Sequence, residues 1–282
     1  MDNVKPCATP MATTCNISKF EGADFSDPQL YRSTVGALHY LGFTRPDIDC
    51  SVHRVSKFMH QPKEPHWQAV KRILRYLKHT ISFSLHFSKQ TNQTLHSFSD
   101  ADWAGDSDDR RSVSAYCIFH EKNLISWSCK QQQTMARSST ESKYKSLSNA
   151  AAELQWIQSV LHDLHISLPQ CPTLWCDNIG ATYLSSNLVF HARTKHIKID
   201  FHYVRDQVLQ KKFQVVFVTS KDQLADVLTI ALNAPRFTML HANLQLQELP
   251  FRLRGDIGAS DAETQVTEED KCRNSSNGNN EE

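Results

Sequence analysis

The chain has 282 residues, enough for one or two domains with a sizeable hydrophobic core, and its formal net charge of +1 means that any nucleic-acid-binding surface must be local. Its longest apolar runs have only a few residues and its start has no signal-peptide-like apolar core, so we expect neither a membrane partner nor secretion. Eight cysteines without a CxxC pair fit a reducing compartment, which predicts an intracellular protein in the cytoplasm or nucleus.

The first 88 residues show helical periodicity. Asp27-Pro28 and Pro46 are typical helix starts, and the segment HWQAVKRILRYLKHT has a clear apolar stripe. The other face of this third predicted helix carries Lys71, Arg72, Arg75 and Lys78. That face is either solvated or lies against a phosphate backbone, where each cation would release a counterion.

The pattern changes after Lys89 to short, alternating segments. LHSFSD, VSAYCIF, NLISWSC, TLWCD and FQVVFV have strand length and composition, and helical patterns separate the later ones. We expect helices in SSTESKYKSLSNAAAELQWIQSVLHDL, from about Ile179, from Arg193 to Gln210, and in KDQLADVLTIAL. This order predicts an α/β fold at 93–232, with a mixed five-stranded sheet flanked by helices and a meander of its first three strands. The acidic, Asn- and Ser-rich stretch 250–282 is typical of a disordered tail.

Four acidic residues fall at the ends of predicted elements. Asp100 ends the first strand, Asp177 ends the fourth, Glu141 lies in the first turn of the long helix, and Asp226 lies in the closing helix. They could converge at one end of the sheet, where α/β proteins commonly build sites. Each also has a simpler explanation: Asp100 as a turn residue, Glu141 in a capping box that starts at Ser138, Asp177 as a helix cap, and Asp226 on a solvated face.

Converging carboxylates would repel one another, and one would take up a proton unless a cation lay between them. Oxygen ligands suit hard ions, so the expected cofactor is Mg²⁺ or Mn²⁺. Two such ions about 4 Å apart could activate water and stabilise the leaving oxygen of a phosphodiester.

Long motifs of the chain resemble the ribonuclease H domain of copia-type retrotransposon Pol polyproteins. They are SDADWAGDSDDRRSVSAYCIF, NLISWSCKQQQTMARSSTESKY, LWCDN, FHARTKHIKIDFHYVRD and VTSKDQLADVLT. Residues 1–88 resemble the thumb and connection of the preceding reverse transcriptase. The resemblance implies a ribonuclease H-like fold and cleavage of the RNA strand of an RNA–DNA hybrid with two divalent ions. It maps the catalytic and metal-binding set onto Asp100, Glu141, Asp177 and Asp226, with Asp102 as a fallback for Asp100.

Two departures from the family pattern bear on function. The polymerase's Tyr-x-Asp-Asp type motif is missing, so polymerase activity is not expected, and the polymerase portion of a Pol polyprotein becomes an expected partner. Lys143 stands where relatives usually carry an acidic residue. The competing prediction is therefore a non-catalytic remnant that binds nucleic acid through basic helices. Arg193, Lys195 and Lys198 form a second basic face, either solvated or in contact with the hybrid.

Overall fold

The computed structural model describes residues 4–15, 17–89, 93–186 and 198–248. The predicted tail at 250–282 lies outside these ranges, as do Arg193, Lys195 and the first part of the helix predicted from Arg193.

Three helices precede the sheet, as predicted: α1 (Pro28–Leu41), α2 (Pro46–Ser56) and α3 (Glu64–His79). Each has proline in its first turn, where the missing N–H costs nothing. The Asp27 side chain accepts a hydrogen bond from the Leu30 N–H and so caps α1. Their apolar faces carry the buried residues, which include Tyr31, Val35, Ile48, Val52, Val70 and Ile73.

The predicted five-stranded mixed sheet is confirmed. Its strands are β2 (Leu95–Asp102), β3 (Val113–His120), β4 (Asn123–Gln131), β5 (Thr173–Cys176) and β6 (Gln214–Phe217). They lie in the order β4-β3-β2-β5-β6, with β2, β3 and β4 antiparallel and β5 parallel to both of its neighbours. The parallel pairing brings the ends of β2 and β5 to the same edge, because Ser99 pairs with Cys176.

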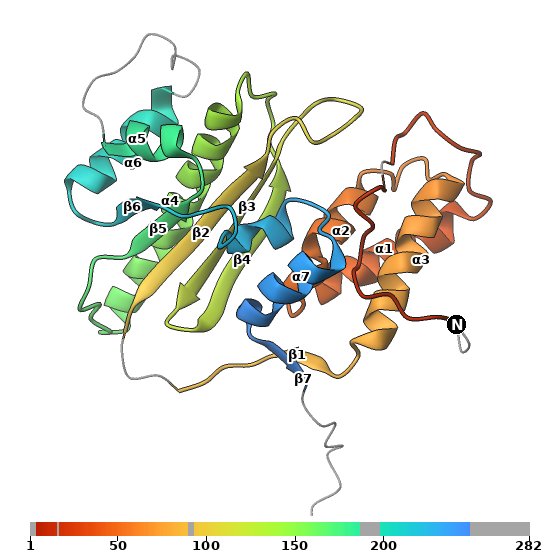
Figure 1. Cartoon of the computed structure of the whole chain (residues 1–282), viewed down its shortest axis with the longest axis horizontal. Helices are drawn as coiled ribbons and strands as arrows, with labels where there is room; N and C mark the ends of the chain where they lie inside the picture. The colour runs from red at the N-terminus through yellow and green to blue at the C-terminus, as the bar shows by residue number, and fades with distance from the viewer. Residues whose placement is uncertain (1–3, 16, 90–92, 187–197, 249–282) are drawn as a thin grey trace, which may run out of the picture. The chain divides into compact units, whose positions relative to one another are not determined.

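Helices cover the sheet on both sides (Figure 1). The long α4 (Ser139–Asp163), with α5 (Ile179–Ser186) and α6 (Lys198–Leu209), forms one hydrophobic core with the sheet, and α1–α3 form another. Alternation along β3 places Cys117 in the core with the N-terminal helices and Ile118 in the core with α4. The N-terminal helices and the sheet thus share buried apolar surface, while the domain boundary between 88 and 93 stays a prediction.

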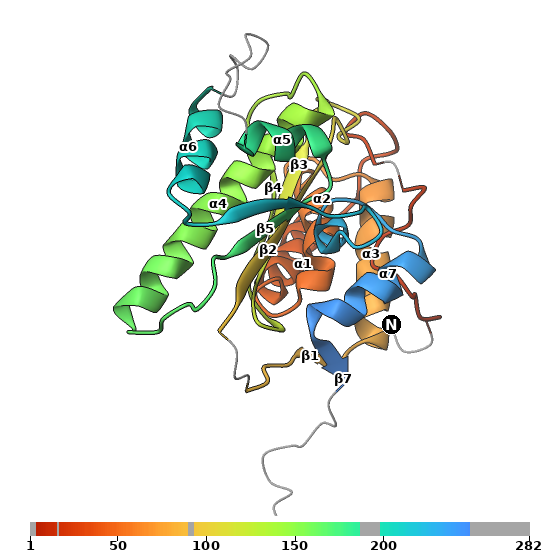
Figure 2. The same ribbon diagram turned by 60° about the vertical axis from the view of Figure 1, so that its left-hand side comes forward.

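The end of the described chain returns to the N-terminal helices. The helix α7 (Ala234–His241) lies beside α3 (Figure 2), where the rings of Phe237 and Tyr76 meet edge to face with centroids 5.7 Å apart. A turn of 3-10 helix, η3 (Ala242–Leu244), leads into β7 (Leu246–Glu248), which pairs with β1 (Phe83–Leu85). No helix in the described ranges has the length and apolar character to cross a bilayer.

The prediction of a single closing helix in KDQLADVLTIAL is wrong. The segment contains only the short 3-10 helix η2 (Leu224–Leu228), and α7 follows as a separate helix. Gln223 explains the early interruption, because its amide donates to the Ser99 carbonyl (3.1 Å) and accepts from the Ala225 N–H (3.2 Å). This contact ties the segment to the end of β2, and Asn233 with Pro235 then starts α7.

Candidate active site

Asp100 and Asp177 lie at neighbouring strand ends, as the sequence predicts. Asp100 belongs to the last residues of β2, and Asp177 follows β5 directly. Their side chains are only 6% and 7% exposed. Two carboxylates this deeply buried would repel each other and remain costly without a partner charge.

That partner is Lys143, in the first turns of α4. Its Nζ lies 2.9 Å from Asp100 Oδ1 and donates hydrogen bonds to Asp177 Oδ1 (2.6 Å) and Oδ2 (2.7 Å). Burial by itself would lower the pKa of Lys143, but the charge of Asp100 and the hydrogen bonds to Asp177 outweigh it and raise this pKa above its ordinary value. The bridging group is therefore an ammonium ion at all physiological pH values.

Asp226 belongs to the same electrostatic cluster. Burial, together with the charges of Asp100 and Asp177, raises the pKa of its carboxyl to about 6 against the opposing effect of Arg236. Arg236 Nη2 donates to Asp226 Oδ2 at 3.0 Å. The same turn of chain supplies Thr229, whose hydroxyl donates to Asp100 Oδ2 at 2.6 Å. The 3-10 helix therefore places both an acid and a hydrogen-bond donor at the strand ends.

Glu141 has a different set of partners. Its N–H donates to Ser138 Oγ (3.1 Å), its carboxylate accepts from the Arg137 N–H (2.9 Å), and Lys145 Nζ lies 3.0 Å from Oε1. The Ser138 contact is one half of the capping box that the sequence leaves open, whereas the Glu141 carboxylate accepts from the N–H of Arg137 rather than from that of the N-cap Ser138. Residues two apart on a helix do not face the same way, so α4 directs Lys143 to Asp100 and Asp177 from a different face than Glu141.

This donor set does not fit a divalent metal ion. Among the described residues, no group of three or more His, Cys, Asp or Glu side chains could hold one. The ammonium of Lys143 lies 2.6–2.9 Å from both central carboxylates and supplies the charge that a metal would otherwise supply. The pair of Mg²⁺ or Mn²⁺ ions expected from the family resemblance therefore disagrees with the side chains present.

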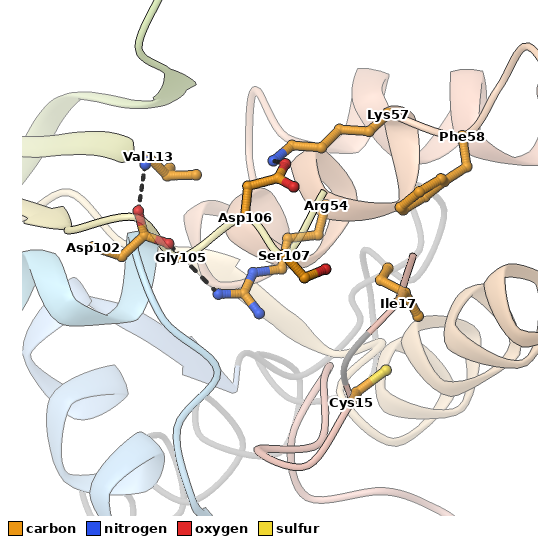
Figure 3. A pocket seen from close by; sticks show the side chains of 10 residues that line it. All are labelled: Cys15, Ile17, Arg54, Lys57, Phe58, Asp102, Gly105, Asp106, Ser107 and Val113. Atoms are coloured by element: carbon orange, nitrogen blue, oxygen red, sulfur yellow. Dashed lines mark hydrogen bonds and ion pairs between the residues drawn. The ribbon is translucent and has the colours of Figure 1, made fainter. Parts of the chain in front are cut away.

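Asp102, the fallback for Asp100, lies in a different environment (Figure 3). Its carboxylate accepts a hydrogen bond from the Val113 N–H and lies 3.8 Å from Arg54 Nη2 of α2. Burial raises the pKa of Asp102 to about 7, against the effects of the Val113 N–H and Arg54. Of the two aspartates, Asp100 is the one that meets Lys143.

The remaining aspartates of SDADWAGDSDD form the charged turn that the sequence suggests, but they also contact the N-terminal segment. Lys57 Nζ lies 2.8 Å from Asp106 Oδ2. Figure 3 shows these two side chains pointing toward each other. Ser18 Oγ donates to Asp108 Oδ1 at 2.5 Å. The turn between β2 and β3 is thereby tied to α2 and to the chain before α1.

The predicted basic face of α3 is partly engaged in the fold. Arg72 donates to Thr9 Oγ1 (2.8 Å), and Lys71 Nζ lies 5.8 Å from the ring centroid of Trp67. Arg75 is half-buried, whereas Lys78 is exposed. Lys198, the described member of the second basic set, is also exposed at the start of α6.

The sequence did not predict the side chains that contact the acidic cluster. Lys143 was noted only as a departure from the family pattern, and neither the cation Arg236 nor the hydroxyl donor Thr229 was predicted. A signal was present for Lys143, because a helix that starts at Ser139 has different faces at positions 141 and 143. No local pattern could reveal Arg236, which reaches Asp226 from the next helix along the chain.

Known relatives match this chain over most of its length. The Pol polyprotein of transposon RE1 from Arabidopsis thaliana is 47% identical over 250 residues, which cover 89% of this chain and 17% of the relative. That of transposon TNT 1-94 from Nicotiana tabacum is 35% identical over 246 residues, 85% of this chain and 18% of the relative. Over most of its length, the chain is a homologue of copia-type transposon Pol polyproteins. It spans less than a fifth of the length of these Pol polyproteins.

No family model matches the chain. Among solved structures, LC11-RNase H1 in complex with an RNA/DNA hybrid aligns with a TM-score of 0.38 and 13% identity, over 48% of this chain and 94% of that one. This likeness is too distant to define a residue correspondence.

Proposed function

We propose that this Pol-family chain is a ribonuclease H-like module that binds RNA–DNA hybrids without a metal ion and does not cut them. One observation carries the proposal: Lys143 bridges the two central carboxylates at 2.6–2.9 Å. The sequence motifs that resemble a ribonuclease H domain of Pol polyproteins support an RNA–DNA hybrid as the ligand. The polymerase portion of a Pol polyprotein is the proposed protein partner, and the cytoplasm or nucleus the proposed compartment.

The charge balance of the cluster of Asp100, Asp177 and Asp226 supports docking of a polyanion. A bare cluster of carboxylates would repel the phosphate backbone of a nucleic acid. Here Lys143 pairs with Asp100 and Asp177, and Arg236 pairs with Asp226. Two cations thus offset much of the charge of three acids, and the phosphates can approach without a bridging ion.

Hydrolysis of the RNA strand is the second candidate function. The Pol family and the convergence of Asp100, Asp177 and Asp226 favour it. Two Mg²⁺ or Mn²⁺ ions would have to displace Lys143 and Arg236 from these carboxylates, with Glu141 as the fourth ligand. The misfit between the donor set and a divalent ion is the reason to rank hydrolysis second.

Binding and cleavage of one labelled RNA–DNA hybrid separate these functions. We expect fluorescence anisotropy to show binding in EDTA that weakens with salt, with a slope of log affinity against log salt that measures the number of phosphate contacts. We expect no RNA fragments on a denaturing gel with Mg²⁺ or Mn²⁺. Absence of hybrid binding would refute the proposal. Metal-dependent cleavage that Asp100→Asn and Asp177→Asn abolish, and that Asp163→Asn at the far end of α4 preserves, would establish the hydrolase instead.

A further inference from the structure

We propose that Lys143 is a built-in cation in the position of a divalent metal, and that a carboxylate at position 143 would turn the cluster of Asp100, Asp177 and Asp226 into a metal site. The inference deepens the proposed function and rests on it for the role of this cluster. It concerns what this chain's own side chains can bind, and it can be tested without any nuclease assay.

The geometry of the bridge is that of a bound cation. Lys143 Nζ lies 2.9 Å from Asp100 Oδ1 and 2.6 Å from Asp177 Oδ1, so one positive centre is shared between acids from two strands. An ammonium carries one charge and three donors, whereas Mg²⁺ and Mn²⁺ need about six oxygen ligands. A divalent ion placed beside the ammonium would be repelled, so the two cations exclude each other.

Asp100 retains an acceptor that the lysine leaves incompletely used. Asp100 is 4% exposed, and its Oδ1 is a buried oxygen to which no donor makes a hydrogen bond of good geometry. The 2.9 Å approach of Lys143 to this oxygen is a charge contact. A buried carboxylate oxygen aimed into the cluster and lacking a donor is the kind of ligand that a metal ion takes up.

Position 143 is also the place from which α4 can complete a ligand set. A glutamate there would add a carboxylate from the helix to those that end β2 and β5, with Asp226 close by on η2. Glu141 cannot take this role from its present position, because it is engaged at the helix start with Arg137 and Lys145. The identity of one residue therefore decides between an internal ion pair and an external metal.

The test is Mn²⁺ binding to the full chain, measured by the electron paramagnetic resonance signal of free Mn²⁺ and by thermal denaturation with and without Mn²⁺. Lys143→Glu should bind Mn²⁺ at least tenfold more tightly than the wild type, and Mn²⁺ should raise its melting temperature. Lys145→Glu is the matched control, a charge reversal on the same helix, and it should behave as the wild type. Asp100→Asn combined with Lys143→Glu should abolish the gain in affinity.

Lys143→Gln removes the ammonium without adding another acid, and it decides the matter if Lys143→Glu fails to fold. It should bind Mn²⁺ more tightly than the wild type, though less than a folded Lys143→Glu. The inference is overturned if the wild type binds Mn²⁺ as tightly as the folded variants, or if Lys145→Glu shows the same gain. Hybrid binding by the wild type in EDTA is a separate measurement, so its absence refutes the proposed function and leaves the metal result to be judged alone.

Discussion

Asp47 in α2 and Asp100 at the end of β2 are both buried next to a cation, yet their surroundings differ. Arg45 donates to both oxygens of Asp47, at 2.9 and 2.7 Å, and the Tyr76 hydroxyl adds a third hydrogen bond at 2.6 Å. Burial would raise the pKa of Asp47, but the nearby His241 ring, whose Nε2 lies 3.6 Å from Oδ2, and the hydrogen bonds from Arg45 outweigh it and lower this pKa to about 2. Here one carboxylate receives three hydrogen bonds and has its own cation.

The cluster of Asp100, Asp177 and Asp226 shows the reverse balance, with fewer cations than carboxylates. Asp100 and Asp177 share one ammonium, and Asp226 has a pKa raised to about 6 by burial and by its two acidic neighbours. A carboxylate whose charge is matched by several donors is costly to unpair, whereas clustered acids with raised pKa values are more typical of functional sites. The comparison therefore distinguishes a structural ion pair from a binding site within one chain.

The largest effect is expected at the structural pair. Asp47→Asn keeps the shape of the side chain but leaves Arg45 buried without its counter-charge, and it should lower the free energy of unfolding by about 3–5 kcal/mol in urea titrations. The control is Asp24→Asn, whose side chain is 69% exposed, and it should change that free energy by less than about 0.5 kcal/mol. Equal stability of the two variants would break the comparison.

The pH dependence of the Asp47 effect follows from the sign of its pKa shift. The pKa of Asp47 is lowered from 3.8 to about 2, so its ionised form stabilises the native state above the unfolded pKa. This contribution disappears as the pH falls through that window. The difference between wild type and Asp47→Asn should therefore shrink below pH 3.8 and be smallest near pH 2.

Removal of the shared cation should have the next largest effect. Lys143→Gln leaves Asp100 and Asp177 facing each other without a charge between them, and it should cost about 1–3 kcal/mol of unfolding free energy at neutral pH. The destabilisation should diminish in acid, where the carboxylates take up protons. Lys145→Gln, which removes a cation from the capping Glu141, is the control and should cost about 0.5 kcal/mol or less. A Lys143→Gln variant as stable as the wild type at neutral pH would mean that the bridge carries no net energy.

Asp226→Asn should move stability in the opposite direction to Asp47→Asn. The pKa of Asp226 is raised from 3.8 to about 6, so the native state holds the proton more tightly, and ionisation destabilises it as the pH rises through this range. Asp226→Asn removes that penalty and should gain about 1–2 kcal/mol over the wild type above pH 6. Urea titrations of both proteins at pH 4 and pH 8 measure the change, and a lower stability of the variant at pH 8 would contradict it.

The smallest effect is expected on α3, outside both clusters. Each of Lys71, Arg72, Arg75 and Lys78 that binds a phosphate should add about 0.7–0.9 to the slope of log hybrid affinity against log salt, and its replacement should remove that amount. Lys71→Ala with Lys78→Ala avoids Arg72, whose hydrogen bond to Thr9 belongs to the fold. An unchanged slope in this double variant, measured by anisotropy, would mean that the face is merely solvated.

The sequence by itself determined the class of the fold. Helical spacing before Lys89 and period-two alternation after it are local patterns, because the side-chain period of a helix or strand is set by its backbone. The five strands and the placement of Asp100 and Asp177 at strand ends could therefore be predicted. The split of the closing segment into η2 and α7 could not, because it depends on a hydrogen bond from Gln223 to the distant Ser99 carbonyl.

Only the tertiary structure decided what the acidic residues face. The sequence places Glu141 and Lys143 on different faces of one helix but does not say which face meets the strand ends. The packing of α4 on the sheet turns Lys143 toward Asp100 and Asp177 and leaves Glu141 at the helix start. Rotation of a helix about its axis is set by the long-range contacts of its buried face, and the two side chains point in different directions on it. That rotation makes position 143 the one that faces the carboxylates, and the residue at this position then decides between an internal ion pair and a metal site.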